Sequence, residues 1–341
     1  SFMHVYIYRL TQGVLAIRKI NEKNKIINME LIIQSLILFI SLVVLAKSSD
    51  FAIDNSVKLS RMIKLREVTV GFLILSLATN LPEMSIAGVS LLSGEIGITI
   101  GNLFGSNVAN IGLVLAVVAI IKPFKITGKT FKEFSTLLFY SSIIPLLLLL
   151  LNIEYATKTI GLGLVLLFAY FAYYSAKERI YLKVREPKKF SYKTVILLCI
   201  GLAGVVISSK LVVDSASRMA DMLGIAETVI GASVISIATT VPELSLCISS
   251  ARKNRLSLAL GNIIGSSLTK ITLLFGVVLI LSTFKVDISI FSTLLMFVLL
   301  SNILAWRFFE TDRRIEKTEG LVLLFVYVIF LIATLGIQIV F

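Results

Sequence analysis

Long apolar segments, separated by short polar connections, make up most of the chain. An α-helix rises about 1.5 Å per residue, so about 20 apolar residues cross the ~30 Å hydrocarbon core of a bilayer. Ten segments fit this description, at about residues 30–53, 67–92, 97–121, 134–152, 157–178, 193–220, 227–250, 257–282, 286–307 and 319–340. The pattern therefore predicts an all-α polytopic membrane protein with ten transmembrane helices.

The composition agrees with this pattern and excludes several classes of protein. Hydrophobic residues make up 57% of the 341 positions and charged residues only 16%, and the mean hydropathy is +0.96. Soluble enzymes, secreted disulfide scaffolds and disordered chains are all less apolar. Cys199 and Cys247 lie in apolar segments and are interpreted as small hydrophobic residues. His4 is the single histidine, so the sequence offers no histidine-based metal cluster or catalytic dyad.

The net charge of +13 follows the predicted topology and does not indicate a nucleic-acid partner. Basic residues cluster in the connections after the odd-numbered spans, as in Lys122, Lys125, Lys129 and Lys132, or Arg252, Lys253 and Arg255. Glu95 is the only charged residue between the second and third spans. The positive-inside rule places the basic connections in the cytoplasm. Both termini are then expected outside, in a protein of the cell membrane.

An internal duplication emerges when the chain is shifted by 160 residues. GFLILSLATNLPEMSIAGVS (71–90) aligns with GASVISIATTVPELSLCISS (231–250), and GNLFGSNVANIGL (101–113) aligns with GNIIGSSLTKITL (261–273). Identical Thr, Pro, Glu, Asn and paired Gly residues indicate duplication rather than chance similarity between apolar helices. The copies begin in spans two and seven, so they cross the membrane in opposite directions. The predicted fold is a five-plus-five inverted-topology repeat.

The duplication divides the chain into four expected parts. These are an N-terminal extension without a transport role (1–28), a first five-helix repeat (29–178, motif 71–113), a cytoplasmic linker (179–192) and a second five-helix repeat (193–341, motif 231–273).

Glu83 and Glu243 lie in the middle of predicted spans, where a charge is costly and a function is the default interpretation. Each follows a proline, which removes a helical N–H and is expected to free carbonyl groups near Ser76 and Ser236. Polar side chains three and four residues earlier share a helix face with each glutamate: Thr79, Asn80, Thr239 and Thr240. Such an all-oxygen cage suits hard cations such as Ca²⁺ or Na⁺. The alternative is a pair of buried, protonated structural carboxyl groups.

The spans that follow carry small and polar residues in both copies. Gly101 and Gly105, like their counterparts Gly261 and Gly265, form GxxxG pairs that let helices approach closely or simply pack. Four-residue spacing places two further pairs of polar side chains on common helix faces: Ser106 with Asn110, and Ser266 with Lys270.

These motifs resemble the two α-repeats of the cation/calcium exchanger superfamily, which contains sodium/calcium and calcium/proton exchangers. ATNLPE and ATTVPE, followed by GNLFGSNVAN and GNIIGSSLTK, carry the resemblance, which covers residues 30–341. It implies ten helices, outward termini, and alternating access in which the first and sixth spans slide across the core. By position, it implies cation ligands at Ser76, Thr79, Asn80, Glu83, Ser106, Asn110, Ser236, Thr239, Thr240, Glu243 and Ser266, with Lys270 in the same set.

Lys270 departs from the family pattern, because it stands where sodium/calcium exchangers typically place an acid. There are three interpretations of its ammonium group. It can replace a bound cation and abolish sodium coupling at that position, or it can release a proton as the cation enters. Alternatively, the side chain snorkels away from the cage and is only structural. Lys47, Asp50 and Asp54 form another charged set, either an ordinary i, i+3 ion pair or a gate on the cation path.

The sequence thus favours a secondary active antiporter of Ca²⁺ or a similar hard cation, with Na⁺ or H⁺ as the counter-ion. It predicts no cofactor, no nucleic-acid partner and no obligatory protein partner beyond inorganic cations and the lipid bilayer. An ion channel and an intramembrane enzyme that uses Glu83 and Glu243 as acid and base are the weaker alternatives.

Overall fold

The computed structural model describes residues 28–52, 79–125, 129–151, 157–177, 191–252, 256–282, 288–310 and 314–340, together with the single positions 25, 54, 55, 58 and 77. Nearly all of these residues are helical. The exception is a two-stranded antiparallel sheet, β1 (Phe124–Lys125) and β2 (Arg314–Ile315), which pairs Phe124 with Ile315. Most of the N-terminal extension and of the predicted linker, and the start of the second span, lie outside the described residues.

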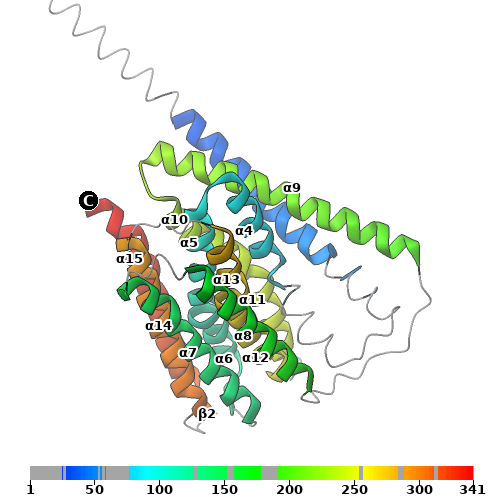
Figure 1. Cartoon of the computed structure of the whole chain (residues 1–341), viewed down its shortest axis with the longest axis vertical. Helices are drawn as coiled ribbons and strands as arrows, with labels where there is room; N and C mark the ends of the chain where they lie inside the picture. The colour runs from blue at the N-terminus through cyan, green and yellow to red at the C-terminus, as the bar shows by residue number, and fades with distance from the viewer. Residues whose placement is uncertain are drawn as a thin grey trace, which may run out of the picture.

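The helices follow the predicted spans closely where they are described. In chain order they are Asn28–Ala52, α4 (Leu81–Ser93), α5 (Ile96–Ala109), η2 (Asn110–Leu115), α6 (Ala116–Ile121), α7 (Lys129–Leu151), α8 (Thr157–Lys177), α9 (Tyr192–Leu223), α10 (Glu227–Ile230), η3 (Gly231–Ile235), α11 (Ser236–Arg252), α12 (Leu256–Thr269), η4 (Lys270–Leu274), α13 (Phe275–Leu281), α14 (Ile288–Glu310) and α15 (Lys317–Val340). Figure 1 shows them packed as one bundle.

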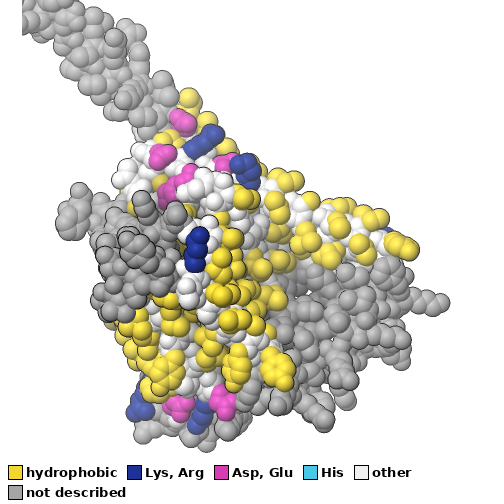
Figure 2. Space-filling model, in the orientation of Figure 1, with side chains coloured by type: hydrophobic (Ala, Val, Ile, Leu, Met, Phe, Trp, Pro, Cys, Tyr) yellow, Lys and Arg dark blue, Asp and Glu magenta, His cyan; other side chains and the backbone are white. Residues whose placement is uncertain are grey.

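Within the described residues, seven helices are long and apolar enough to cross a membrane. Three shorter apolar helices accompany them, at Leu81–Ser93, Ser135–Leu148 and Lys158–Tyr173. In Figure 2, hydrophobic side chains cover the middle of the visible face, and most charged side chains gather at its two ends. This distribution fits a surface that faces lipid hydrocarbon between two polar interfaces.

Three long helices of the bundle are each interrupted by a π-helical turn: η2 lies between α5 and α6, η3 between α10 and α11, and η4 between α12 and α13. We call these continuous helices rods. The first π turn begins at Asn110 and the third at Lys270, positions that are equivalent under the 160-residue shift. A π turn inserts an extra residue into the hydrogen-bond ladder and is frequent at functional sites. The helix periodicity of the sequence does not reveal these turns.

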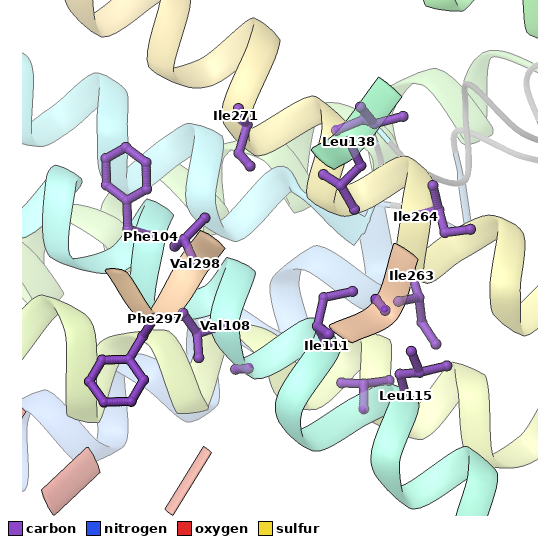
Figure 3. Close-up of a cluster of buried hydrophobic side chains, with 14 of the residues drawn as sticks. Phe104, Val108, Ile111, Leu115, Leu138, Ile263, Ile264, Ile271, Phe297 and Val298 are labelled. Carbon is purple, nitrogen blue, oxygen red and sulfur yellow. The ribbon is translucent and has the colours of Figure 1, made fainter. Parts of the chain in front are cut away.

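The hydrophobic core lies around α5–η2 and α12, the helices that contain the two copies of the second motif. In Figure 3, Phe104, Val108 and Ile111 of the α5–η2 rod gather with Ile263 and Ile264 of α12 and with side chains of α7 and α14. The ring of Phe104 meets Phe275 and Phe291 edge-on, with centroids 5.0 and 5.5 Å apart.

Helix α9 and the helix Asn28–Ala52 lie side by side along one flank of the bundle (Figure 1). They meet where glycine replaces a side chain: a Cβ atom on Gly201 would lie 3.0 Å from the Cα of Ala52, and one on Gly204 would lie 2.7 Å from Oγ of Ser48. Many of their apolar side chains are exposed, as at Ile200. The pair is thus attached to the bundle along one face only.

Other glycine contacts repeat under the sequence shift. Gly161 of α8 touches the backbone of Gly276 in α13, and Gly320 of α15 touches the backbone of Ala116 in α6. Ala116 and Gly276 are 160 residues apart. Gly161 and Gly320 are 159 residues apart, so the two contacts correspond to within one residue in the two halves of the chain.

The GxxxG pair of α5 allows the closest approach between helices near the polar centre. A Cβ atom on Gly101 would lie 2.2 Å from the carbonyl oxygen of Thr228, and one on Gly105 would lie 2.7 Å from the Cα of Ala232. These neighbours are backbone atoms, which cannot turn away as a side chain can. The predicted close approach of this GxxxG helix to its neighbour is confirmed.

We predict that Gly101→Ala destabilises the protein by about 1–3 kcal/mol, because the added methyl group forces α5 away from α10 and η3. Thermal unfolding in detergent measures the effect. The control is Gly163→Ala on α8, where a Cβ atom meets nothing within 4 Å. An equal unfolding temperature for the two variants would contradict the packing described here.

Candidate functional site

The predicted site residues come together where α4, α11 and the two π-containing rods α5–η2 and α12–η4 meet. All of those within the described part of the chain are buried: Thr79, Asn80, Glu83, Ser106, Asn110, Ser236, Thr239, Thr240, Glu243, Ser266 and Lys270. Ser76 lies outside the described residues.

The two prolines have different local effects. Pro82 occupies the first turn of α4, which begins at Leu81 after a turn at Asn80. Pro242 lies inside α11, which continues past it. Six residues earlier, the carbonyl oxygen of Ser236 accepts the hydroxyl group of Thr240 at 2.7 Å. The hydroxyl group of Thr239 lies 3.3 Å from the same carbonyl oxygen. The chain's own hydroxyl groups therefore contact the carbonyl that the sequence analysis assigned to a cation.

The charged centre of the site consists of Lys270 and the two glutamates. The Nζ atom of Lys270 lies 3.0 Å from Oε1 of Glu83 and 3.5 Å from Oε1 of Glu243, and all three side chains are completely shielded from solvent. Within the described residues they are the only buried charged side chains. The suggestion that Lys270 snorkels away from the cage is wrong, because its ammonium lies between the two carboxylates.

Ser266 connects the charged centre to both repeats. Its hydroxyl group lies 3.2 Å from Oε1 of Glu243 and 3.1 Å from Oδ1 of Asn80, either of which can accept its single proton. The amide of Asn110 donates to the same hydroxyl oxygen at 3.1 Å. Ser266 is therefore fixed by groups from α4, α11 and η2.

Several oxygen atoms at the site keep free acceptor capacity. Oε2 of Glu83, Oε2 of Glu243 and Oδ1 of Asn110 are buried and accept no hydrogen bond from the residues that the structure describes. Buried acceptors are almost always satisfied, so such a cluster indicates a missing donor or cation. Carboxylate and amide oxygens are the ligands that hard cations such as Ca²⁺ and Na⁺ prefer.

Two asparagines outside the predicted set also hold the site. Thr239 donates to Oδ1 of Asn102 at 3.0 Å, and Thr79 donates to Oδ1 of Asn262 at 3.2 Å. Each bond joins one repeat to the other, and the 160-residue shift converts one into the other. A hydroxyl group that donates its only proton to asparagine presents lone pairs to any other neighbour. The sequence signal that could have identified these two asparagines is the Gly-Asn dipeptide at the start of both copies of the second motif.

Lys47 and Asp50 of the first helix, and Asp54 just beyond it, are exposed rather than part of the buried site. Whether they form an ion pair or a gate remains a prediction from the sequence.

Apolar helices around two buried carboxylates and several hydroxyl and amide oxygens are typical of a membrane cation transporter. The family model described as sodium/calcium exchanger protein matches residues 33–177 and again residues 193–336. The chain belongs to the sodium/calcium exchanger family, whose members are integral membrane transporters of inorganic cations and not enzymes.

Named relatives cover nearly the whole chain. The sodium/calcium exchanger MaX1 of Methanosarcina acetivorans is 28% identical over 87% of this chain and 97% of its own length. The putative antiporter CaxA of Alkalimonas amylolytica is 27% identical over 87% and 97%. A solved structure of the sodium-calcium exchanger NCX_Mj, soaked with Na⁺ and Sr²⁺, superposes with a TM-score of 0.61 at 26% identity, over 88% of this chain and 98% of that chain.

We predict that Asn102→Ala and Asn262→Ala each weaken cation transport by about fivefold in apparent affinity, since each variant loses one hydrogen bond of about 1 kcal/mol that orients a threonine hydroxyl group. The concentration dependence of ⁴⁵Ca²⁺ uptake into proteoliposomes measures this. Ser35→Ala is the control, because that exposed hydroxyl bonds only to the carbonyl of Leu31 and, at 3.9 Å, to the sulfur of Met219. Unchanged affinity in both asparagine variants would remove these residues from the site.

Proposed function

We propose that the chain is a secondary active antiporter that moves Ca²⁺ or a similar hard cation by alternating access through the site between Glu83 and Glu243. The observation that carries the proposal is the meeting of these two carboxylates. They come from equivalent positions of the duplicated motif, they are fully buried, and each keeps one oxygen without a hydrogen-bond partner among the described residues. An intramembrane charge with no structural partner for part of its oxygens is expected to serve transport.

The proposed architecture is ten transmembrane helices arranged as a five-plus-five inverted repeat with both termini outside the cell membrane. The seven long and three shorter apolar helices supply the required elements. Two separate matches of one family model, on either side of residues 178–192, support the division into two repeats. A central site at the repeat interface is what such a fold provides.

The proposed movement is a slide of the helix Asn28–Ala52 and of α9 across the core. Support comes from their place on one flank of the bundle and from the glycines that separate them. Small residues at the crossing between these two helices let them pack closely against each other and move as a pair.

The counter-ion is Na⁺ or H⁺, and Lys270 distinguishes the two cases. Relatives such as MaX1 are named sodium/calcium exchangers, which favours Na⁺ by analogy. The second candidate is a cation/proton exchanger with Lys270 as the proton carrier, favoured by the ammonium's contacts with both carboxylates. An ion channel and an intramembrane enzyme receive no support from the comparisons.

Glu83→Gln and Glu243→Gln are each expected to abolish cation exchange, by about 100-fold or more, because one carboxylate cannot replace the hydration of a hard cation. Isotope exchange in proteoliposomes, with equal cation on both sides, is the measurement. Glu30→Gln, at the exposed start of the first long helix, is the control. Full exchange in either site variant would disprove the site assignment.

If the ammonium of Lys270 stands in for a bound cation, the wild type should show little sodium-driven Ca²⁺ exchange. Lys270→Asp changes the local charge by about two units and should strengthen Na⁺ and Ca²⁺ binding several-fold or more. Uptake is measured with Na⁺ and pH gradients imposed independently. Flux that follows a pH gradient at zero Na⁺ would favour the proton alternative, and ordinary sodium/calcium exchange unchanged in Lys270→Ala would refute both.

A further inference from the structure

The candidate site has a cation of its own, the ammonium group of Lys270. Lys270 begins the π turn η4, which packs against α5, α7, α8, α12 and α13. The groups of opposite charge that reach its Nζ atom are Glu83 of α4, at 3.0 Å, and Glu243 of α11, at 3.5 Å. Each ion pair uses Oε1, and Oε2 of both glutamates is buried without a hydrogen-bond partner among the described residues. With all three groups ionised, the unloaded centre has a net charge of −1 instead of −2.

This charge matters for the step in which an empty carrier returns across the membrane. Two ionised carboxylates without partners are very costly in a dry protein interior. A carrier with only these two groups must therefore bind a counter-ion before it reverses, and this requirement makes exchange obligatory. An ammonium between the carboxylates removes much of that cost, because opposite charges at 3–4 Å attract strongly at low dielectric.

The described part of the core offers this ammonium no other acidic partner. Within the described residues no further acidic side chain is buried, so Lys270 has no alternative partner in the core. The equivalent residue of the first repeat is Asn110, which carries no charge. The compensation is thus specific to one position and to one repeat.

Resting on the function proposed above, we infer that Lys270 is a tethered counter-ion: its ammonium occupies the carboxylates when the substrate leaves and lets the empty carrier return without a cation from solution. Exchange with a second cation is then optional, and the protein also carries out net cation flux. No bond forms or breaks in this cycle, since Lys270 keeps its proton and only its carboxylate contacts change.

The experiment compares two fluxes in the same proteoliposomes, loaded with ⁴⁵Ca²⁺ and held at fixed voltage with valinomycin and K⁺. Self-exchange into medium containing Ca²⁺ requires the loaded carrier only. Net efflux into medium containing a chelator and no Na⁺ requires the empty carrier to return. For the wild type we expect net efflux within about tenfold of self-exchange, a range set by the barrier that the ion pairs remove.

Variants at position 270 test the role of the ammonium. In Lys270→Asn, which copies Asn110 of the first repeat, the ratio of net efflux to self-exchange should fall by about tenfold or more, whatever the absolute rate of self-exchange becomes. Lys270→Arg keeps a permanent positive charge and should keep net efflux. Lys210→Asn is the control, since Lys210 pairs with Asp214 at 3.3 Å on the exposed part of α9. If Lys270→Asn fails to fold, the wild type and Lys270→Arg still decide the question through their ratio of net efflux to self-exchange.

Three results would overturn the inference. The first is a wild type that self-exchanges but shows no net efflux, and the second is a Lys270→Asn variant with an unchanged ratio of net efflux to self-exchange. The third is net efflux matched by proton uptake, detected with a dye inside the vesicles, because protons would then be the counter-ion. Absence of self-exchange in the wild type would instead defeat the proposed function, and the inference with it.

Discussion

The structure depends on how two carboxylates are kept in an interior that excludes water. Glu83 and Glu243 have no solvent exposure, and the ammonium of Lys270 lies within 3.5 Å of both. The nearby polar groups also serve this arrangement: Ser266 contacts one carboxylate directly, and Asn80 and Asn110 hold Ser266. Without these partners, burial of both charges would cost more than the stability of a typical domain.

The helical scaffold around this centre is symmetric, and its charge is not. Hydrogen bonds from Thr79 to Asn262 and from Thr239 to Asn102 are equivalent under the 160-residue shift, and the glycine contacts of α8 with α13 and of α15 with α6 match to within one residue. These backbone and neutral polar contacts therefore follow the duplication. At the site, the main departure from the duplication is at one pair of positions, where the first repeat has Asn110 and the second has Lys270.

Much of this organisation could be predicted from the sequence. Apolar length located the seven helices that are long enough to cross a membrane and the three shorter apolar helices. The equal spacing in the two motif copies identified Glu83 and Glu243 as a pair before any contact was known. The sodium/calcium exchanger family was likewise identified from these motifs and is confirmed by the family match.

Other features could not be predicted because they arise from tertiary packing. The π turns at Asn110 and Lys270 leave no mark on a periodic apolar pattern. The role of Asn102 and Asn262 requires knowing that α5 crosses α11 and that α12 crosses the start of α4. Similarly, a buried lysine can pair or snorkel, and only the packing of η4 beside both glutamates decides between these outcomes.

The single lysine has one more consequence under the proposed alternating access. In a carrier built from inverted repeats, the two repeats exchange conformations when the open side changes. A charge present in only one repeat makes the inward-open and outward-open forms unequal in energy. Under this proposal the protein has a preferred resting face and different apparent affinities on its two sides, while the ion gradients still set the direction of net transport.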